Sequence, residues 1–255
     1  MILRLALASL FARALTVGMT ILAIALSVAL FLGVEKIRTS AKASFTNTIS
    51  GTDLIVGARS GSVQLLLYSV FRIGNATNNL TWQSYQDIAA RADVAWAVPI
   101  SLGDSHRQFR VMGTTVAFFE HYKYRKRRAL ALTYGVIISD LFDTVVGSDV
   151  AKTLKYSVGD PIIIAHGLAS FTEHKDQPFR VSGILEKTGT PVDRTVIVNM
   201  EAIEAIHVDW KSGAKTPGQS TPVDVIRRMD LTPKAVTAAL IGVKTPLKTF
   251  ALQRR

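Results

Sequence analysis

The stretch "ALTVGMTILAIALSVALFLGV", Ala14 to Val34, contains no charged residue. At about 1.5 Å per residue, a helix of this length crosses a hydrocarbon core of roughly 30 Å. A buried helix of a soluble domain is usually shorter and has a polar stripe. A cleaved signal peptide has a shorter apolar core, and no clear A-x-A site precedes Glu35. The segment 14–34 is therefore predicted to be a retained transmembrane helix.

The flanks of this span differ in character. Residues 1–13, "MILRLALASLFAR", form an amphipathic N-terminal segment that either lies on the membrane or lengthens the span. Residues 35–50 contain no helix breaker and are predicted to continue the span as a stalk helix. Lys and Arg residues occur on both sides of the span, so the positive-inside rule does not orient it.

The composition indicates an anionic partner. The chain has 255 residues, a formal charge of +11 and a pI of about 10.0, which suits either nucleic acid or a phospholipid surface. The basic run His121 to Arg128, "HYKYRKRR", has interleaved tyrosines that could stack on bases. A chain anchored in a membrane favours a solvated or lipid-facing loop, because anionic headgroups attract each basic residue by about 1 kcal/mol. We therefore expect membrane lipid as a partner and no nucleic acid.

Residues 51–244 are predicted to form a domain of the α+β class, with mixed strands and helices. Thr81 is a predicted N-cap, and the segment 235–244 is either a buried strand or a helix, of which we favour the strand. Residues 211–221 are a predicted loop, and a helix is expected to begin in 245–255. Helices are predicted at 81–91, 148–155 and 200–207, and strands at 52–56, 94–102, 108–112, 162–165, 179–185 and 195–198.

No motif for catalysis or cofactor binding is present. The glycine-rich turn "GARSGS" is not a phosphate loop, because Ser62 and Val63 stand where that motif requires Gly and Lys. There is no G-x-S-x-G or S-x-x-K motif, and the lack of cysteine excludes disulfides, thiolate zinc sites and cysteine nucleophiles. We predict no catalytic, cofactor-binding or metal residues, and a protein that is not an enzyme.

One group of residues has metal-ligating side chains. The segment "HGLASFTEHKD" contains His166, Glu173, His174 and Asp176, but its histidine spacing fits none of the short metal motifs. A polar hairpin tip is the favoured interpretation, although these ligands could still converge by folding.

Several stretches together carry a family resemblance. They are "LSVALFLGVEKIRTSAKASF", "SGTDLIVGARSG", "LLLYSVFRIGNATNN", "GSDVAKTLKYSVGDPIII", "FRVSGILEKTGTPVDRTVIVN" and "ALIGVK". In this order they resemble the N-terminal part of a bacterial ABC transporter permease of the FtsX-like, MacB-like family. The resemblance implies a first transmembrane helix followed by a MacB-like periplasmic core domain of two subdomains. It also implies a location in the bacterial inner membrane, with the domain after residue 35 outside the cytoplasm.

The resemblance further implies a non-catalytic permease subunit. ATP would be bound by a separate cassette protein, whose ATP hydrolysis drives export or extraction of a periplasmic or lipophilic substrate. The implied partners are this ATP-binding subunit, membrane lipid and a second permease copy. Such permeases have three further spans, so residues 245–255 are expected to lead to a missing C-terminal transmembrane region. The alternative is a single-span adaptor or sensor whose extracytoplasmic domain binds a partner.

Overall fold

The computed structural model describes residues 4, 8, 10–59, 61–167, 174, 176–211, 214–216 and 218–245. The chain divides into two compact units, residues 1–46 and residues 47–255. The helix expected from residue 245 onward falls almost entirely outside the described residues, as does part of the amphipathic segment 1–13.

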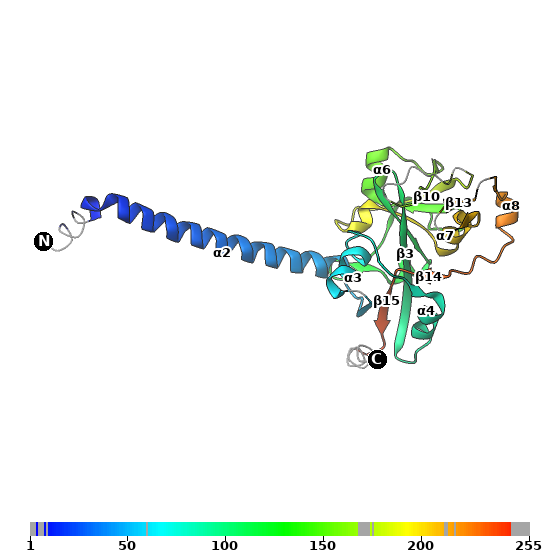
Figure 1. Cartoon of the computed structure of the whole chain (residues 1–255), viewed down its shortest axis with the longest axis horizontal. Coiled ribbons are helices and arrows are strands. Elements are labelled where there is room, and N and C mark those ends of the chain that lie inside the picture. Colours follow the sequence, from blue (N-terminus) through cyan, green and yellow to red (C-terminus); the bar gives the residue numbers. More distant parts are fainter. Residues whose placement is uncertain are drawn as a thin grey trace. The chain divides into compact units, whose positions relative to one another are not determined.

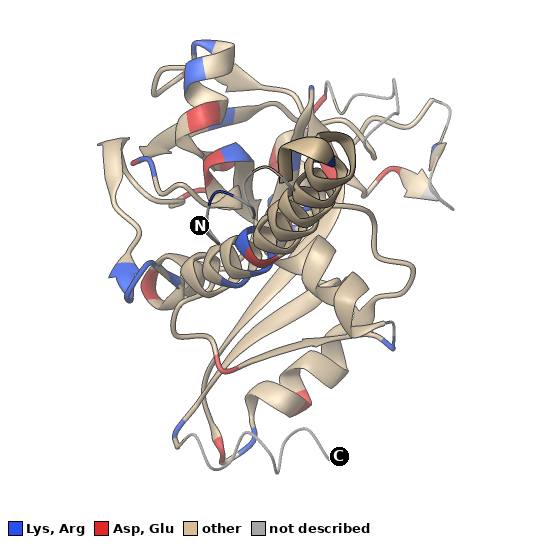
Figure 2. Ribbon diagram, turned by 90° about the vertical axis from the view of Figure 1, so that its left-hand side faces the viewer, with Lys and Arg blue, Asp and Glu red and all other residues tan. Residues whose placement is uncertain are grey.

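The first unit is built on helix α2, Ala14–Thr48, whose 35 residues continue into the first residues of the second unit. The helix covers the predicted span and continues without a break through the predicted stalk. Thr20 and Ser27 donate their hydroxyl hydrogens to backbone carbonyls one turn earlier, which satisfies both groups within the apolar stretch. Among the described residues, α2 is the one helix long and apolar enough to cross a membrane. Figure 2 shows most of α2 without Lys, Arg, Asp or Glu.

The second unit is a mixed α/β domain around one large sheet (Figure 1). Within the described residues nine strands form this sheet, in the order β1-β15-β3-β4-β11-β8-β10-β7, with β9 on β10. Their bounds are β1 Leu54–Gly57, β3 Val94–His106, β4 Phe109–Thr114, β7 Leu132–Gly135, β8 Asp143–Val146, β9 Pro161–Ile162, β10 Phe179–Leu185, β11 Thr195–Asn199 and β15 Ala238–Val243.

Strand β3 connects the two halves of the sheet. Its first part, from Val94 to Ile100, pairs with β15, and its second part, from Ser101 to His106, pairs with β4. A shift in register between Leu102 and Ser105 marks an irregularity in the second part. Such bulges bend a strand and redirect its side chains, so β3 presents its last residues differently from a regular strand.

The remaining elements are short. The helices are α3 Ser62–Ser69, α4 Trp82–Ala89, α5 Ala117–His121, α6 Ser148–Leu154, α7 Met200–Ile206, α8 Val223–Ile226 and the 3-10 turn η1 Pro191–Arg194. Three further ladders pair β2 Leu80–Thr81 with β14 Ala235–Val236, β5 Lys123–Tyr124 with β6 Arg128–Ala129, and β12 Trp210–Lys211 with β13 Ala214–Lys215.

Most of the predicted elements form, with some corrections. Thr81 caps α4 by accepting a hydrogen bond from Ser84 N, and the segment 235–244 is strand rather than helix. The helix predicted at 148–155 is α6, Ser148–Leu154, whose N-cap residue Gly147 is extended and makes no side-chain hydrogen bond. The strand predicted at 162–165 is only Pro161–Ile162, and the loop predicted at 211–221 contains part of the β12-β13 hairpin.

The core lies on both faces of the sheet. Along β11, Val196 and Val198 join one buried cluster and Ile197 joins the other, as the alternation of a strand requires. The first cluster also contains buried residues of α6 and α7, which therefore cover that face. The second buried cluster contains Tyr122 and Tyr124 of the basic run. Both rings are buried in the protein interior and are not accessible for stacking on bases.

Candidate metal centre

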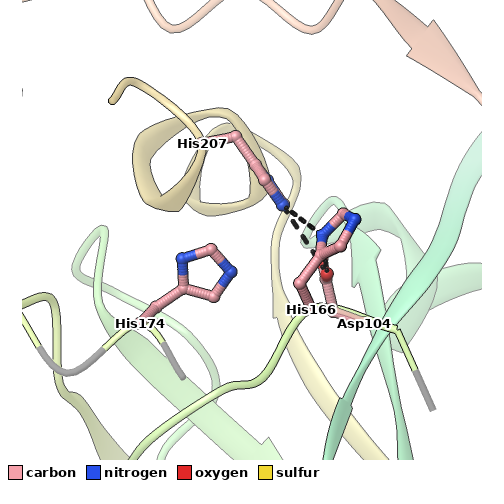
Figure 3. Close-up of side chains that lie close together, drawn as sticks. All are labelled: Asp104, His166, His174 and His207. Carbon is pink, nitrogen blue, oxygen red and sulfur yellow. Dashed lines mark hydrogen bonds and ion pairs between the residues drawn. The ribbon is translucent and has the colours of Figure 1, made fainter. Parts of the chain in front are cut away.

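Four side chains from separate parts of the domain converge beside α7. They are Asp104, His166, His174 and His207, and one potential ligand atom from each lies within 4.8 Å of all the others (Figure 3). Figure 3 shows His207 projecting from a helix toward His166 and Asp104, with His174 to their left in this view. Within the described residues, no other group of three or more His, Cys, Asp and Glu side chains is arranged in this way.

Asp104 is placed by the irregular end of β3. Asp104, Ser105 and His106 are buried in succession at the end of β3. The register of β3 against β4 shifts between Leu102 and Ser105, so Asp104 lies in the irregular part of the strand. Asp104 is only 4% exposed.

His166 is held next to Asp104 by the backbone. Ser105 N donates to Ala165 O at 2.9 Å, and Ala165 N donates to Ser105 O at 2.8 Å. The Ser105 hydroxyl also donates to Gly167 O. These three bonds fix the chain on both sides of His166, so its imidazole stands beside the neighbouring carboxylate.

His207 and His174 enter from the other side. His207 is the C-cap of α7, and its Nδ1 donates to Ile203 O at 2.7 Å, which leaves Nε2 of the neutral ring with a lone pair. His174 N donates to Ile164 O at 2.8 Å, and the His174 ring also has a hydrogen bond with the backbone of Ile206. Both imidazoles are thus oriented by backbone groups.

The distances inside the cluster are short. His166 Nδ1 lies 3.0 Å from His207 Nε2 and 3.3 Å from Asp104 Oδ1, and His207 Nε2 lies 3.7 Å from the same oxygen. Two buried atoms, Asp104 Oδ1 and His174 Nε2, have no hydrogen-bond partner among the described residues. Unpartnered buried polar atoms cost about 1 to 3 kcal/mol each, so a ligand that bonded both of these atoms would stabilise the domain.

The surroundings shift the pKa values of His166 and His174 in opposite directions. The carboxylate of Asp104 raises the pKa of His166, against the effect of partial burial. Burial, with the neighbouring His207, lowers the pKa of His174 to about 4. His174 is therefore an uncharged imidazole at neutral pH, which is the form that binds metals.

The other histidines and the other predicted polar residues lie elsewhere. His106 is buried, with Nδ1 2.6 Å from Ile163 O and Nε2 2.8 Å from Tyr156 Oη, and His121 stacks on Trp96. Asp176 forms an ion pair with Lys215, and Glu173 lies outside the described residues. The hairpin-tip interpretation thus placed His166 and His174 in one segment but missed Asp104 and His207, because their distance in the sequence gives no local signal.

The described part of the chain thus consists of one long apolar helix and one mixed α/β domain. A family model described as the MacB-like periplasmic core domain matches residues 17–230. The chain therefore belongs to the MacB-like family of ABC transporter permeases, whose permease components are generally non-catalytic.

Solved structures with a similar fold include two transporter domains. The periplasmic region of MacB from Actinobacillus actinomycetemcomitans matches with a TM-score of 0.46 and 10% identity, covering 82% of this chain and 82% of that chain. The extracellular domain of the noncanonic ABC-type transporter YknZ from Gram-positive bacteria matches with a TM-score of 0.39 and 12% identity, covering 68% of this chain and 78% of that one. No curated protein sequence matches the chain.

Proposed function

We propose that the protein is a permease subunit of an ABC transporter, in which ATP hydrolysis by a separate cassette protein moves α2 and the extracytoplasmic domain. The observation that carries this proposal is the unbroken helix from the uncharged segment to Thr48, combined with membership of the MacB-like family. A helix transmits rotation and displacement along its length, whereas a flexible linker would absorb them.

The last residues of α2 are bound tightly in the second unit. Arg125 N donates to Asn47 O at 2.8 Å, the Tyr122 hydroxyl donates to Thr48 O, and Arg127 N donates to Ser50 Oγ at 3.1 Å. Thr48 is buried, and the Tyr122 ring belongs to the core. A movement of the helix end would therefore pull on the domain core directly.

The turn that receives the helix end has an unusual backbone. Arg125, Lys126 and Arg127 have φ values of 32°, 53° and 65°, in the left-handed region that non-glycine residues seldom adopt. Such a conformation costs of order 1 kcal/mol or more per residue and persists only when the surroundings impose it. The hydrogen bonds to Asn47 and Ser50 help to impose this conformation. They support the proposal that the turn 125–127 connects the end of α2 rigidly to the domain.

The remaining parts of the proposal follow from the family. The domain after residue 35 would lie in the periplasm of a bacterial inner-membrane protein, in contact with a second permease copy and with a periplasmic or lipophilic substrate. Lipid would surround α2, and the protein itself would bind no ATP. The competing function is an adaptor or sensor with one span, in which no cassette protein takes part.

The proposal is tested by inserting alanines into the stalk helix, which rotates the domain relative to the apolar part of α2. Two alanines inserted after Ser40 turn the domain by about 200° and lengthen the helix by about 3 Å, whereas four alanines turn it by only about 40° but lengthen it by about 6 Å. The protein and its two variants are purified from the native bacterium, the co-purifying proteins are identified by mass spectrometry, and ATP hydrolysis by the complex is measured.

We expect an ATP-binding cassette protein to co-purify, and hydrolysis to fall several-fold with two alanines but much less with four. Equal loss in the two variants would contradict transmission by rotation. Failure of any cassette protein to co-purify with the unaltered chain would contradict the permease function and favour the adaptor.

A further inference from the structure

We propose that Asp104, His166, His174 and His207 bind one Zn²⁺ ion in the extracytoplasmic domain. This site is independent of the transport function proposed above, because its evidence lies entirely in the cluster of side chains. The argument rests on the spacing of the donor atoms, on their chemistry, and on the groups that surround them.

The spacing fits a tetrahedron. Zinc–ligand bonds of about 2.0 to 2.1 Å in tetrahedral geometry place neighbouring ligand atoms about 3.3 Å apart. The measured separations among Asp104 Oδ1, His166 Nδ1 and His207 Nε2 are 3.0, 3.3 and 3.7 Å, which average close to that edge. His174 completes the group within 4.8 Å, a distance that small side-chain adjustments on binding can close.

The donor chemistry selects the metal class. Three imidazole nitrogens and one carboxylate oxygen suit zinc, whereas calcium and magnesium require mainly oxygen ligands. Four protein ligands also fill the tetrahedral shell, as in sites that hold zinc without activating a water molecule. The arrangement therefore indicates a binding site and not a hydrolytic centre.

The surroundings are those of metal-binding histidines. Such residues usually donate their second ring N–H to a carbonyl or carboxylate, which fixes the tautomer. His207 does so to Ile203 O, and His174 has its hydrogen bond with the backbone of Ile206. The Trp210 ring covers the group, with centroids 4.6 Å from His174 and 4.9 Å from His166. The side chains of His166 and His207 are 38% and 23% exposed, which gives an ion a route from solvent.

A hydrogen-bond network without a metal ion explains fewer of the contacts among these four side chains. A hydrogen bond between His166 Nδ1 and His207 Nε2 accounts for their separation of 3.0 Å. It leaves Nε2 of the buried His174 without a hydrogen-bond partner, and it gives Asp104 Oδ1 only the ion-pair distances to His166 and His207. One metal ion satisfies both atoms at once and also holds the other two ligands.

The test is a zinc titration of the full chain in detergent micelles, after tag removal and treatment with EDTA. Trp210 lies against the ligands, so its fluorescence reports binding, and Trp210→Phe should remove that signal. Cobalt(II) in place of zinc should give the intense visible absorption of a tetrahedral ion. We expect one ion per chain, without competition from Mg²⁺ or Ca²⁺.

One ligand variant and one control variant test whether these four residues bind the zinc ion. His166→Gln removes a partly exposed ligand and should weaken zinc binding by about 100-fold or more. His121→Gln removes an imidazole outside the cluster and should leave the affinity unchanged. If near-UV circular dichroism shows that His166→Gln has lost its fold, Asp104→Asn replaces it with the same expectation. Equal affinities in unaltered protein and ligand variant, or an octahedral cobalt spectrum, would overturn the proposal.

Discussion

Asp193 and Asp104 are buried carboxylates of the same domain, but they differ in the hydrogen bonds that they accept. Asp193 lies in the "TGTPVD" loop and accepts from Thr188 N at 2.8 Å, Thr188 Oγ1 at 2.8 Å and Gly189 N at 2.7 Å, with Lys187 Nζ at 3.3 Å. Oδ1 of Asp104 accepts none from the described residues. The two are 2% and 4% exposed, so burial does not explain the contrast.

The difference separates a structural role from a binding role. The bonds to Asp193 close the loop onto itself, with Thr190 accepting from Val192 N and Pro191 beginning η1. A buried charge that is fully satisfied in this way stabilises one backbone conformation. Oδ1 of Asp104 has only the ion-pair distances to the His166 and His207 rings, and the zinc ion proposed above would complete its contacts.

The largest expected effect is at Asp193. Asp193→Ala leaves the two backbone N–H groups and the Thr188 hydroxyl without their acceptor, and should lower the free energy of unfolding by about 3 kcal/mol. Urea unfolding of the full chain in detergent micelles, followed by tryptophan fluorescence, measures it. Asp149→Ala removes the more exposed partner of Lys187 and should cost less than about 1 kcal/mol. Similar losses in both variants would show that the loop bonds matter no more than a surface ion pair.

A second saturated carboxylate, Asp143, should show an intermediate effect. It accepts from Ser139 N, Ser139 Oγ, Asp140 N and Arg180 Nη2 at 2.9 to 3.2 Å. Asp143→Asn should lower the free energy of unfolding by about 2 kcal/mol at neutral pH. The exposed Asp87→Asn makes the same change of charge and should have almost no effect.

The loss of unfolding free energy in the Asp143→Asn variant should also depend on pH. Burial would raise the pKa of this carboxyl, but the hydrogen bonds from Arg180, Ser139 and Asp140 outweigh it and hold the pKa below 3.8. The ionised group therefore contributes stability in full above about pH 3.8, and this contribution is lost as the pH falls through the folded-state pKa. The difference in unfolding free energy between the unaltered protein and the Asp143→Asn variant should be constant near neutral pH and shrink below about pH 3.8. A constant difference down to lower pH would contradict the lowered pKa.

The smallest expected effect is at Asp104 in metal-free protein. Asp104→Asn removes a buried charge whose Oδ1 accepts no hydrogen bond, so the free energy of unfolding in EDTA should change by less than about 0.5 kcal/mol or rise. The same unfolding measurement with zinc should stabilise the unaltered chain and not the variant. A large loss of stability in EDTA would mean that Asp104 has a structural role like that of Asp193.

Much of the fold could be predicted from local patterns. The uncharged stretch predicted α2, the alternation of apolar residues predicted β10 and β11, and Thr81 was recognised as an N-cap. The ends of β3 and β9 were less predictable, because the length of a strand depends on the neighbouring strands with which it pairs. Strands β7 and β8, each of four residues, were not predicted.

The candidate site could be predicted only in part. His166 and His174 stood out as a pair of metal-ligating residues close in sequence, whereas nothing marked Asp104 or His207. Asp104 lies where the pairing of β3 with β4 is irregular, and His207 is the C-cap residue of α7, which covers one face of the sheet. Neither property can be read from neighbouring residues.

The sequence by itself determined the membrane helix, the class of domain and the family, because hydrophobic length, residue alternation and motif order are properties of contiguous chain. Only the tertiary structure decided which carboxylates are satisfied and which imidazoles meet. Those outcomes depend on contacts between residues as far apart as Asp104 and His207, which are brought together by the order of strands in the sheet and by the packing of α7.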